Sequence, residues 1–144
     1  MKSYYCLITS DSKHENAFKI FKKRIEEKKY PLYLKTPHLN EIKEKDQVVF
    51  YIAGKQINSQ TFVACAEVSL IDDLLTTTID PDKNSNLIVK YLTLEKIFFF
   101  KYPKKIKLIL NELGFIKNIK HYGVNLVGGV TKISHQDFIK IKYM

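Results

Sequence analysis

Apolar residues are concentrated in four short runs that are rich in β-branched and aromatic side chains. These runs span residues 3–9, 47–53, 61–71 and 87–94. Such a composition is typical of β-strands, because branched and aromatic side chains pack well on a pleated surface. The first run is apolar at nearly every position, which predicts a strand covered on both faces.

In the third run, apolar residues occupy every second position. These side chains are expected on one face of the strand: Phe62, Ala64, Ala66, Val68 and Leu70. A short polar loop separates this run from the second one, so an antiparallel hairpin or meander is predicted. Residues 72–86 hold acids and turn-forming residues, which predict a loop.

Capping signals and helical periodicity predict three helices. Ser12 and Glu15 form a capping-box pattern that opens a helix reaching about Lys28. Its apolar stripe consists of Phe18, Phe21 and Ile25. Residues 104–113 fit a short helix followed by Gly114, and a third helix is predicted to start at Ser134.

The order of these elements lacks the regular strand–helix–strand alternation of a parallel sheet. We therefore predict one α+β domain over residues 1–144, with a small, mostly antiparallel β-barrel or curved sheet and short flanking helices. Residues 30–40 are irregular yet apolar, which favours a loop folded over the core or over a pocket.

The chain is basic, with a net charge of +9 and a pI of about 9.4, and it is rich in lysine. Such a charge attracts polyanions such as DNA or RNA without sequence-specific contacts, although a general bias toward lysine would give the same composition. Arg24 is the only arginine. Reading of guanine edges by arginine forks is therefore not expected.

No pattern in the chain predicts a cofactor, a metal site or catalysis. Cys6 and Cys65 lie in apolar runs, where a cysteine is usually a small buried hydrophobe. Nucleophile elbows, phosphate-binding glycine loops and zinc motifs are missing from the sequence. A signal-peptide pattern and a stretch long enough to span a membrane are missing as well, so a cytoplasmic, non-catalytic protein is expected.

Four stretches taken together resemble the EVE domain, a member of the PUA-like superfamily that also contains the YTH and ASCH domains. The resemblance is carried by the strand at 5–10, by IKEKDQVVFY at 42–51, by FVACAEV at 62–68, and by LGFIKN at 113–118 with the later Tyr122-Gly123 and Gly128-Gly129. The chain departs from the family pattern at Lys45, at Val127 and at Tyr122, where a glycine, an arginine and a tryptophan are common. Pro31-Leu32-Tyr33 stands in place of a loop that carries a tryptophan in the family.

The resemblance implies a pocket, between the sheet and the loop after the first helix, that accepts a flipped or single-stranded modified base. In such a pocket an aromatic wall stacks on the base and a few polar groups read its edge. The candidate lining residues are Ser10, Tyr33, Thr36, Tyr51, Phe62 and Tyr122. Each has an alternative role: a turn residue for Ser10, a loop residue for Thr36, and a packing aromatic for the others.

Three functions remain open from the sequence. The first is a nucleic-acid-binding module that recognises a modified or unpaired base in DNA or RNA. The second is an ASCH-like RNA-processing hydrolase or nuclease on the same fold, which would need a converging set of catalytic side chains in the cleft. The third is an accessory protein that binds polyanions without base preference and with steep salt dependence.

Overall fold

The computed structural model describes residues 2–80 and 83–143. These residues form a six-stranded sheet with the strand order β2-β5-β4-β3-β1-β6. The strands are β1 (Tyr4–Thr9), β2 (Lys29–Tyr33), β3 (Gln47–Ile52), β4 (Thr61–Asp80), β5 (Lys83–Lys105) and β6 (Val130–Ile133). β1 and β3 are parallel, and the other paired strands are antiparallel. The expected α+β class with a mostly antiparallel, curved sheet is confirmed.

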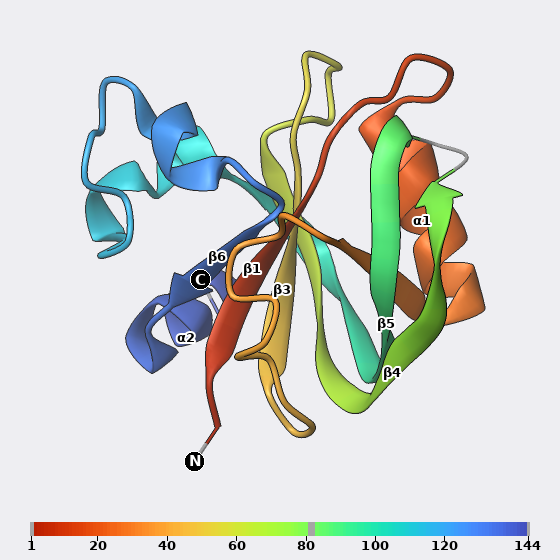
Figure 1. Cartoon of the computed structure of the whole chain (residues 1–144). Coiled ribbons are helices and arrows are strands. Elements are labelled where there is room, and N and C mark those ends of the chain that lie inside the picture. The colour runs from red at the N-terminus through yellow and green to blue at the C-terminus, as the bar shows by residue number, and fades with distance from the viewer. Residues whose placement is uncertain (1, 81–82, 144) are drawn as a thin grey trace.

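Two helices cover opposite faces of the sheet. The long β4–β5 ribbon bends strongly and rises beside α1 (Ala17–Glu27), whereas α2 (His135–Tyr143) lies on the other side near β1 and β6 (Figure 1). Side chains of β1 alternate between the two resulting cores: Tyr5 and Leu7 pack toward α1, and Cys6 and Ile8 pack toward α2. β1 is therefore covered on both faces, as its unbroken apolar sequence predicts.

A β-bulge changes which face Phe62 occupies. Phe50 pairs with Ala64 and Tyr51 pairs with Phe62, so Val63 is an extra residue on β4. Phe62 consequently packs in the core beside α2, whereas Ala64 packs in the core beside α1. The prediction that these two side chains share one face was wrong, because a bulge breaks the period of two.

The predicted loop over residues 72–86 was also wrong. β4 continues to Asp80 and β5 begins at Lys83, and residues 81–82 of that segment lie outside the described residues. Asp73 pairs in register with Lys90, and their charged groups lie 3.4 Å apart. Cross-strand pairing thus extends the hairpin through a polar sequence, because the backbone hydrogen bonds do not require apolar side chains.

The first helix starts later than the capping-box pattern predicts. Asn16 is the N-cap and accepts a hydrogen bond from the Lys19 amide at 3.0 Å. Ser12 instead accepts from the Glu15 amide at 3.0 Å, within a turn that precedes the helix. Ser12 therefore bonds to Glu15 as the capping-box pattern predicts, but this hydrogen bond closes a turn and does not start the helix.

The remaining elements follow the sequence in part. Residues 104–113 form no α-helix, because β5 runs to Lys105 and two short 3-10 turns follow, η1 (Ile106–Leu108) and η2 (Leu110–Glu112). Ser134 caps α2 by accepting from the Asp137 amide at 3.0 Å, as predicted. A third 3-10 turn, η3 (Tyr122–Leu126), lies before β6. The apolar segment 30–40 is partly regular, since β2 pairs with β5 there.

Candidate functional site

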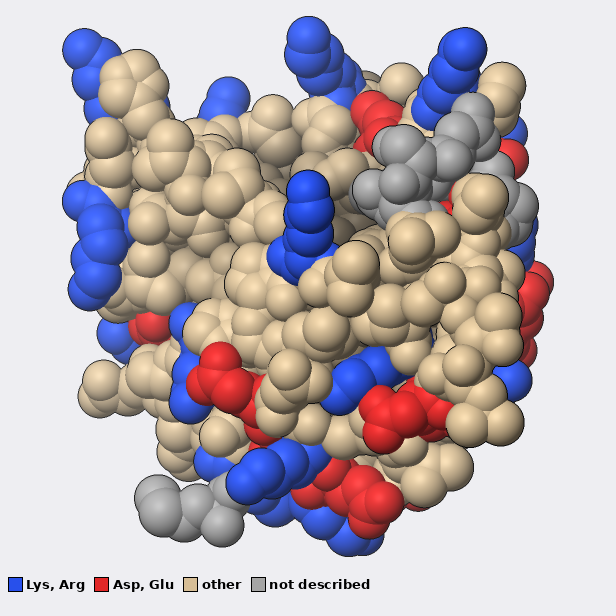
Figure 2. Space-filling view, in the orientation of Figure 1, with Lys and Arg blue, Asp and Glu red and all other residues tan. Residues whose placement is uncertain are grey.

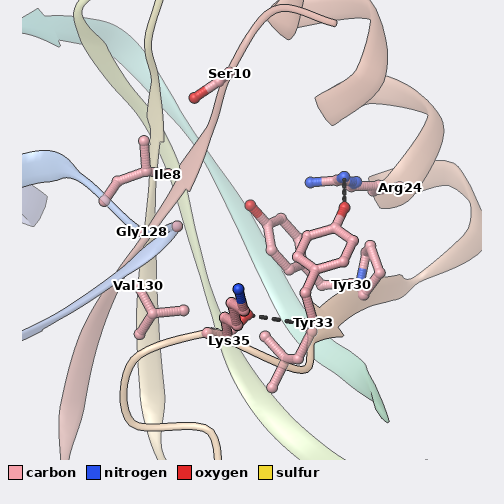
Figure 3. Close-up of a pocket in the computed structure, with 12 residues that line it drawn as sticks. Ile8, Ser10, Arg24, Tyr30, Tyr33, Lys35, Gly128 and Val130 are labelled. Atoms are coloured by element: carbon pink, nitrogen blue, oxygen red, sulfur yellow. Dashed lines mark hydrogen bonds between the residues drawn. The ribbon is translucent and has the colours of Figure 1, made fainter. Parts of the chain in front are cut away.

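A cavity of about 270 Å³ lies where the end of β1 faces α1 and β2 (Figure 3). One wall comes from α1 and from β2 with the residues after it, and it carries Arg24, Tyr30, Tyr33 and Thr36. The other wall comes from β1 and from the glycine segment before β6: Ile8, Ser10, Gly128, Gly129 and Val130. Lys35 also lines this cavity, which we call the tyrosine pocket.

Arg24 organises the polar side of the tyrosine pocket. Its guanidinium lies over the Tyr30 ring, 4.7 Å from the ring centre, and donates a hydrogen bond to the Tyr33 hydroxyl at 2.9 Å. It also lies 3.7 Å from the Asp80 carboxylate, to which the Tyr33 hydroxyl donates a hydrogen bond. Arg24 and Asp80 are both buried, so this is a desolvated ion pair with a tyrosine hydroxyl between the charges.

Burial and these neighbours change the acidity of both groups. Burial raises the pKa of Tyr33, and the hydrogen bond to Asp80 raises it further, against the opposing effect of Arg24. Burial by itself lowers the pKa of Arg24, but Tyr30, Tyr33 and Asp80 reverse this and raise it. Tyr33 therefore keeps its proton and Arg24 its charge at neutral pH.

Two further hydrogen bonds hold the tyrosine wall. The Tyr30 hydroxyl lies 3.0 Å from the Thr9 hydroxyl at the end of β1. The Thr36 hydroxyl accepts from the Tyr33 amide at 2.8 Å, and the Thr36 amide donates to the Tyr33 carbonyl at 3.0 Å. Thr36 thus closes a tight turn after β2 and orients Tyr33, a role that the sequence left as one of two alternatives.

Two glycines form part of the opposite wall. Gly128 and Gly129 have φ values of +85° and +88°, which side-chain-bearing residues rarely adopt. A Cβ atom at Gly128 would lie 2.8 Å from Pro37, so the chain passes close to the loop after β2. The Gly129 carbonyl accepts from the Ile8 amide at 2.8 Å. The glycine pair therefore gives the pocket a thin wall opposite the tyrosine rings.

The structure brings together only some of the residues proposed from the sequence. Ser10, Tyr33 and Thr36 line the tyrosine pocket. Tyr51 and Tyr122 line a second hollow of about 330 Å³, beyond β1 and near η3. Phe62 is fully buried and packs on Tyr51, with ring centres 5.1 Å apart, and it is among the lining residues of neither hollow.

Arg24 and Tyr30 are pocket residues that the sequence reasoning missed. Arg24 lies three residues after Phe21 and four after Ile20, which places it on the buried stripe of α1 rather than with the exposed lysines. The position of the single arginine on this stripe could have indicated from the sequence that its side chain is buried. Tyr30 gave no comparable signal, because its role depends on the pairing of β2 with β5.

Charge is unevenly distributed over the surface. On the face shown in Figure 2, lysine side chains project from the upper and left margins, and most of the acidic side chains gather in the lower half and along the right edge. Within residues 2–80 and 83–143, His, Cys, Asp and Glu side chains form no group of three that could hold a metal ion. The helices of the described chain are too short or too polar to cross a membrane.

Comparisons with known proteins support the fold. No protein-family model and no curated protein sequence matches the chain. The N-terminal domain of Staphylothermus marinus McrB has a similar structure, with a TM-score of 0.64 and 10% identity over 98% of this chain and 93% of that chain. Two more solved structures are also similar.

The first is protein Atu2648 from Agrobacterium tumefaciens, with a TM-score of 0.54 and 11% identity over 96% of this chain and 90% of that one. The second is a hypothetical protein from Leishmania major, with a TM-score of 0.56 and 14% identity over 98% and 92%. At these identities the likeness concerns the fold alone. Together with the curled mixed sheet, it shows that the chain has an α+β, PUA-like fold.

Proposed function

We propose that this protein is a non-catalytic nucleic-acid-binding module of the EVE type, which holds one unpaired or flipped base of DNA or RNA in the tyrosine pocket. The observation that carries the proposal is the pairing of two tyrosine rings, ordered by a buried arginine, with a glycine wall across a cavity of about 270 Å³. This volume is just below the range of about 300–1,000 Å³ that is usual for drug-sized ligands. A single planar heterocycle suits such a space better than a complete nucleotide.

The chemistry of the pocket suits recognition of a base. Base–aromatic stacking contributes about 1–3 kcal/mol per base. Ser10 and Lys35 add a hydroxyl and an ammonium group to the lining, and both can bond polar atoms at a base edge. A methyl group on the base would gain apolar contact from Val130 on the opposite wall.

The acidity of Tyr33 favours binding over catalysis. A general base or nucleophile works best when its pKa is close to the working pH. Burial instead raises the pKa of the Tyr33 hydroxyl, and both of its hydrogen-bonding directions are occupied by Arg24 and Asp80. This supports a structural role for the hydroxyl, with the ring left to stack on the base, over the ASCH-like catalytic alternative.

Oligonucleotide binding tests the proposal. Short single-stranded DNA and RNA, with and without one methylated cytosine or adenine, are titrated at low and at physiological salt. We expect a preference for one base form that survives added salt, and a loss of about 10- to 100-fold in the affinity for that base form in Tyr33→Leu, in line with the stacking energy. Tyr102→Leu, at a tyrosine that is 73% exposed and outside the pocket, is the matched control.

Because Tyr33→Leu also disturbs the buried ion pair, Ser10→Leu is measured alongside it. Ser10 is half-buried at the rim, so the larger side chain narrows the pocket without entering a core. Equal binding of all oligonucleotides that disappears with salt would contradict the proposal and favour binding to polyanions without base preference.

A further inference from the structure

A lysine-rich groove lies next to the tyrosine pocket, around the loop between β3 and β4. The second hollow, which holds Tyr122 and Lys120, lies on one side of this loop. A third hollow of about 300 Å³ lies on its other side and is lined by Lys55, Lys105 and Lys107. Gln60 lines both hollows, so the two adjoin, and together we call them the lysine groove.

The side chains that line the lysine groove carry positive charge, and the Asp11 carboxylate lies close to Gly54 at one edge of the second hollow. Lys55, Lys105, Lys107 and Lys120 are all exposed, and His121 lies beside Lys120. Among the described residues, the lining of both hollows includes no Asp or Glu, and none of the four lysines forms an ion pair with a carboxylate. Elsewhere, Lys90 and Lys96 lie within ion-pair distance of Asp73 and Glu67. The charge of the groove is therefore available to an anionic partner.

The frame of the groove is held in place by hydrogen bonds. The Gln60 carbonyl accepts from the Ile106 amide at 3.0 Å, and its side-chain oxygen accepts from the Tyr122 hydroxyl. Lys105 donates to the Ile57 carbonyl at 2.7 Å, which ties the loop to the end of β5. Gln60 itself has a φ of +56°, so the loop closes through a left-handed residue. The groove is thus a shaped surface that binding does not have to order first.

A thin partition separates the lysine groove from the tyrosine pocket. Ile8 lines the pocket, and its partner in the β1–β3 ladder, Tyr51, lines the groove. Leu126 lines the groove and Gly128, two residues later, lines the pocket. Neighbouring strands lie about 4.8 Å apart and successive Cα atoms about 3.8 Å apart, so the linings of the two sites meet at the ends of β1 and β3.

We infer that the lysine groove binds the phosphates of the nucleic-acid strand that flanks the base in the tyrosine pocket. This inference rests on the proposed function. Lys120 lines one hollow of the groove, and Lys55, Lys105 and Lys107 line the other. A nucleic-acid strand carries a phosphate at every nucleotide and can contact both hollows at once, whereas a single free phosphate occupies one.

A charge-matched pair of triple variants tests the inference. Lys55→Gln/Lys107→Gln/Lys120→Gln removes three charges from the groove and spares Lys105, which supports the loop. Lys2→Gln/Lys43→Gln/Lys45→Gln removes three exposed charges at the opposite end of β1 and β3, as Figure 1 shows for the N-terminal end. Binding of one single-stranded oligonucleotide of about six nucleotides is measured as a function of salt.

We expect the groove variant to reduce the slope of log affinity against log salt by about 2, because each lost single-strand phosphate contact contributes about 0.7. The control variant should retain the wild-type slope, and the preference among bases should persist in both. A groove variant that behaves like the control overturns the inference while leaving the proposed function intact. If the wild type shows no preference that depends on Tyr33, the proposed function itself fails, whatever the slopes.

A length series gives a second, independent readout. Wild-type affinity should rise from a single nucleoside to an oligonucleotide of about six nucleotides, because added phosphates reach the groove. The groove variant should gain much less over the same series. An equal gain in both proteins would place the flanking strand elsewhere and would also overturn the inference.

Discussion

At the residue scale, Arg24 connects the core to the tyrosine pocket. It is the only arginine of the chain, and its planar guanidinium stacks on Tyr30 while donating to Tyr33 and pairing with Asp80. A lysine at this position would supply charge but neither the flat face nor the fork of donors. A single arginine was not expected to read base edges with its fork of donors. In the structure, Arg24 orders the ring wall from behind and is held by protein partners.

We predict that Arg24→Met lowers the free energy of unfolding by about 3–5 kcal/mol, because the Asp80 carboxylate stays buried without the guanidinium charge. Adding Asp80→Asn to this variant should recover part of the loss, since the uncompensated charge is then gone. Urea unfolding of the wild type, both single variants and the double variant measures the coupling. A loss below about 1 kcal/mol for Arg24→Met would contradict the geometry of the buried pair.

At the scale of elements, the start of α1 shows how a capping pattern can close a turn. The Asp11 carboxylate accepts from the Ala17 amide at 2.7 Å, and Asn16 accepts from Lys19. These two side chains satisfy amide groups at the start of the helix that would otherwise lack partners. Ser12 forms the bond to Glu15 that its sequence predicts, but residues 12–15 precede the helix. A capping box identifies a local hydrogen bond and not the helix that follows it.

We expect Asn16→Ala to destabilise the protein by about 1 kcal/mol, the usual effect of losing an N-cap side chain. Ser12→Ala should cost less than half as much, because its bonds lie in a partly exposed turn outside the helix. Chemical denaturation of both variants under identical conditions gives the comparison. Equal losses would place the start of the helix at Ser12, as the sequence pattern alone suggests.

At the scale of the whole molecule, one sheet separates two hydrophobic cores and positions two surface features. The core beside α1 supports the tyrosine pocket, and the core beside α2 lies under the second hollow through Tyr51 and Leu126. The bent β4–β5 ribbon supplies Asp80 to one feature and Lys105 to the other. Because the two cores bury both cysteines and several tyrosines, their thiols and hydroxyls lie in environments that disfavour ionisation.

The stability of the protein should consequently fall at alkaline pH. Burial raises the pKa values of the thiols Cys6 and Cys65 and of the hydroxyls of Tyr33 and Tyr51. The native state therefore holds these protons more tightly than the unfolded state, so the stabilisation is complete below the unfolded pKa values and is lost as the pH rises above them. Those values are about 8.5 for cysteine and 10 for tyrosine.

We expect the free energy of unfolding to decrease from about pH 8.5 upward, at up to about 1.4 kcal/mol per pH unit for each group that ionises only on unfolding. Cys6→Ala should be less stable at neutral pH but should show a shallower decline between about pH 8.5 and 10. Urea unfolding over this pH range measures both slopes. A flat profile in the wild type would mean that these groups ionise equally in both states.

Much of the fold could be predicted from the sequence because buried strands appear in it as continuous runs of apolar residues. Four apolar runs correctly placed β1, β3, the first half of β4 and the central part of β5, and the unbroken apolar sequence of the first run predicted that both of its faces are covered. The cap at Ser134 correctly placed α2. For the site, six residues were expected in one pocket. Ser10, Tyr33 and Thr36 line the tyrosine pocket, whereas Tyr51 and Tyr122 line another hollow and Phe62 is buried.

Only the tertiary structure decided the features that depend on pairing. The bulge at Val63, the extension of the ribbon to Asp80 and the contact of Asp80 with Arg24 arise from hydrogen bonds and packing between distant segments. A local pattern records whether a side chain is buried but not which partner covers it. For this reason the sequence by itself determined where the apolar strand segments lie and which class of fold they build, while long-range pairing determined how far the strands extend and which side chains meet in the pocket and in the groove.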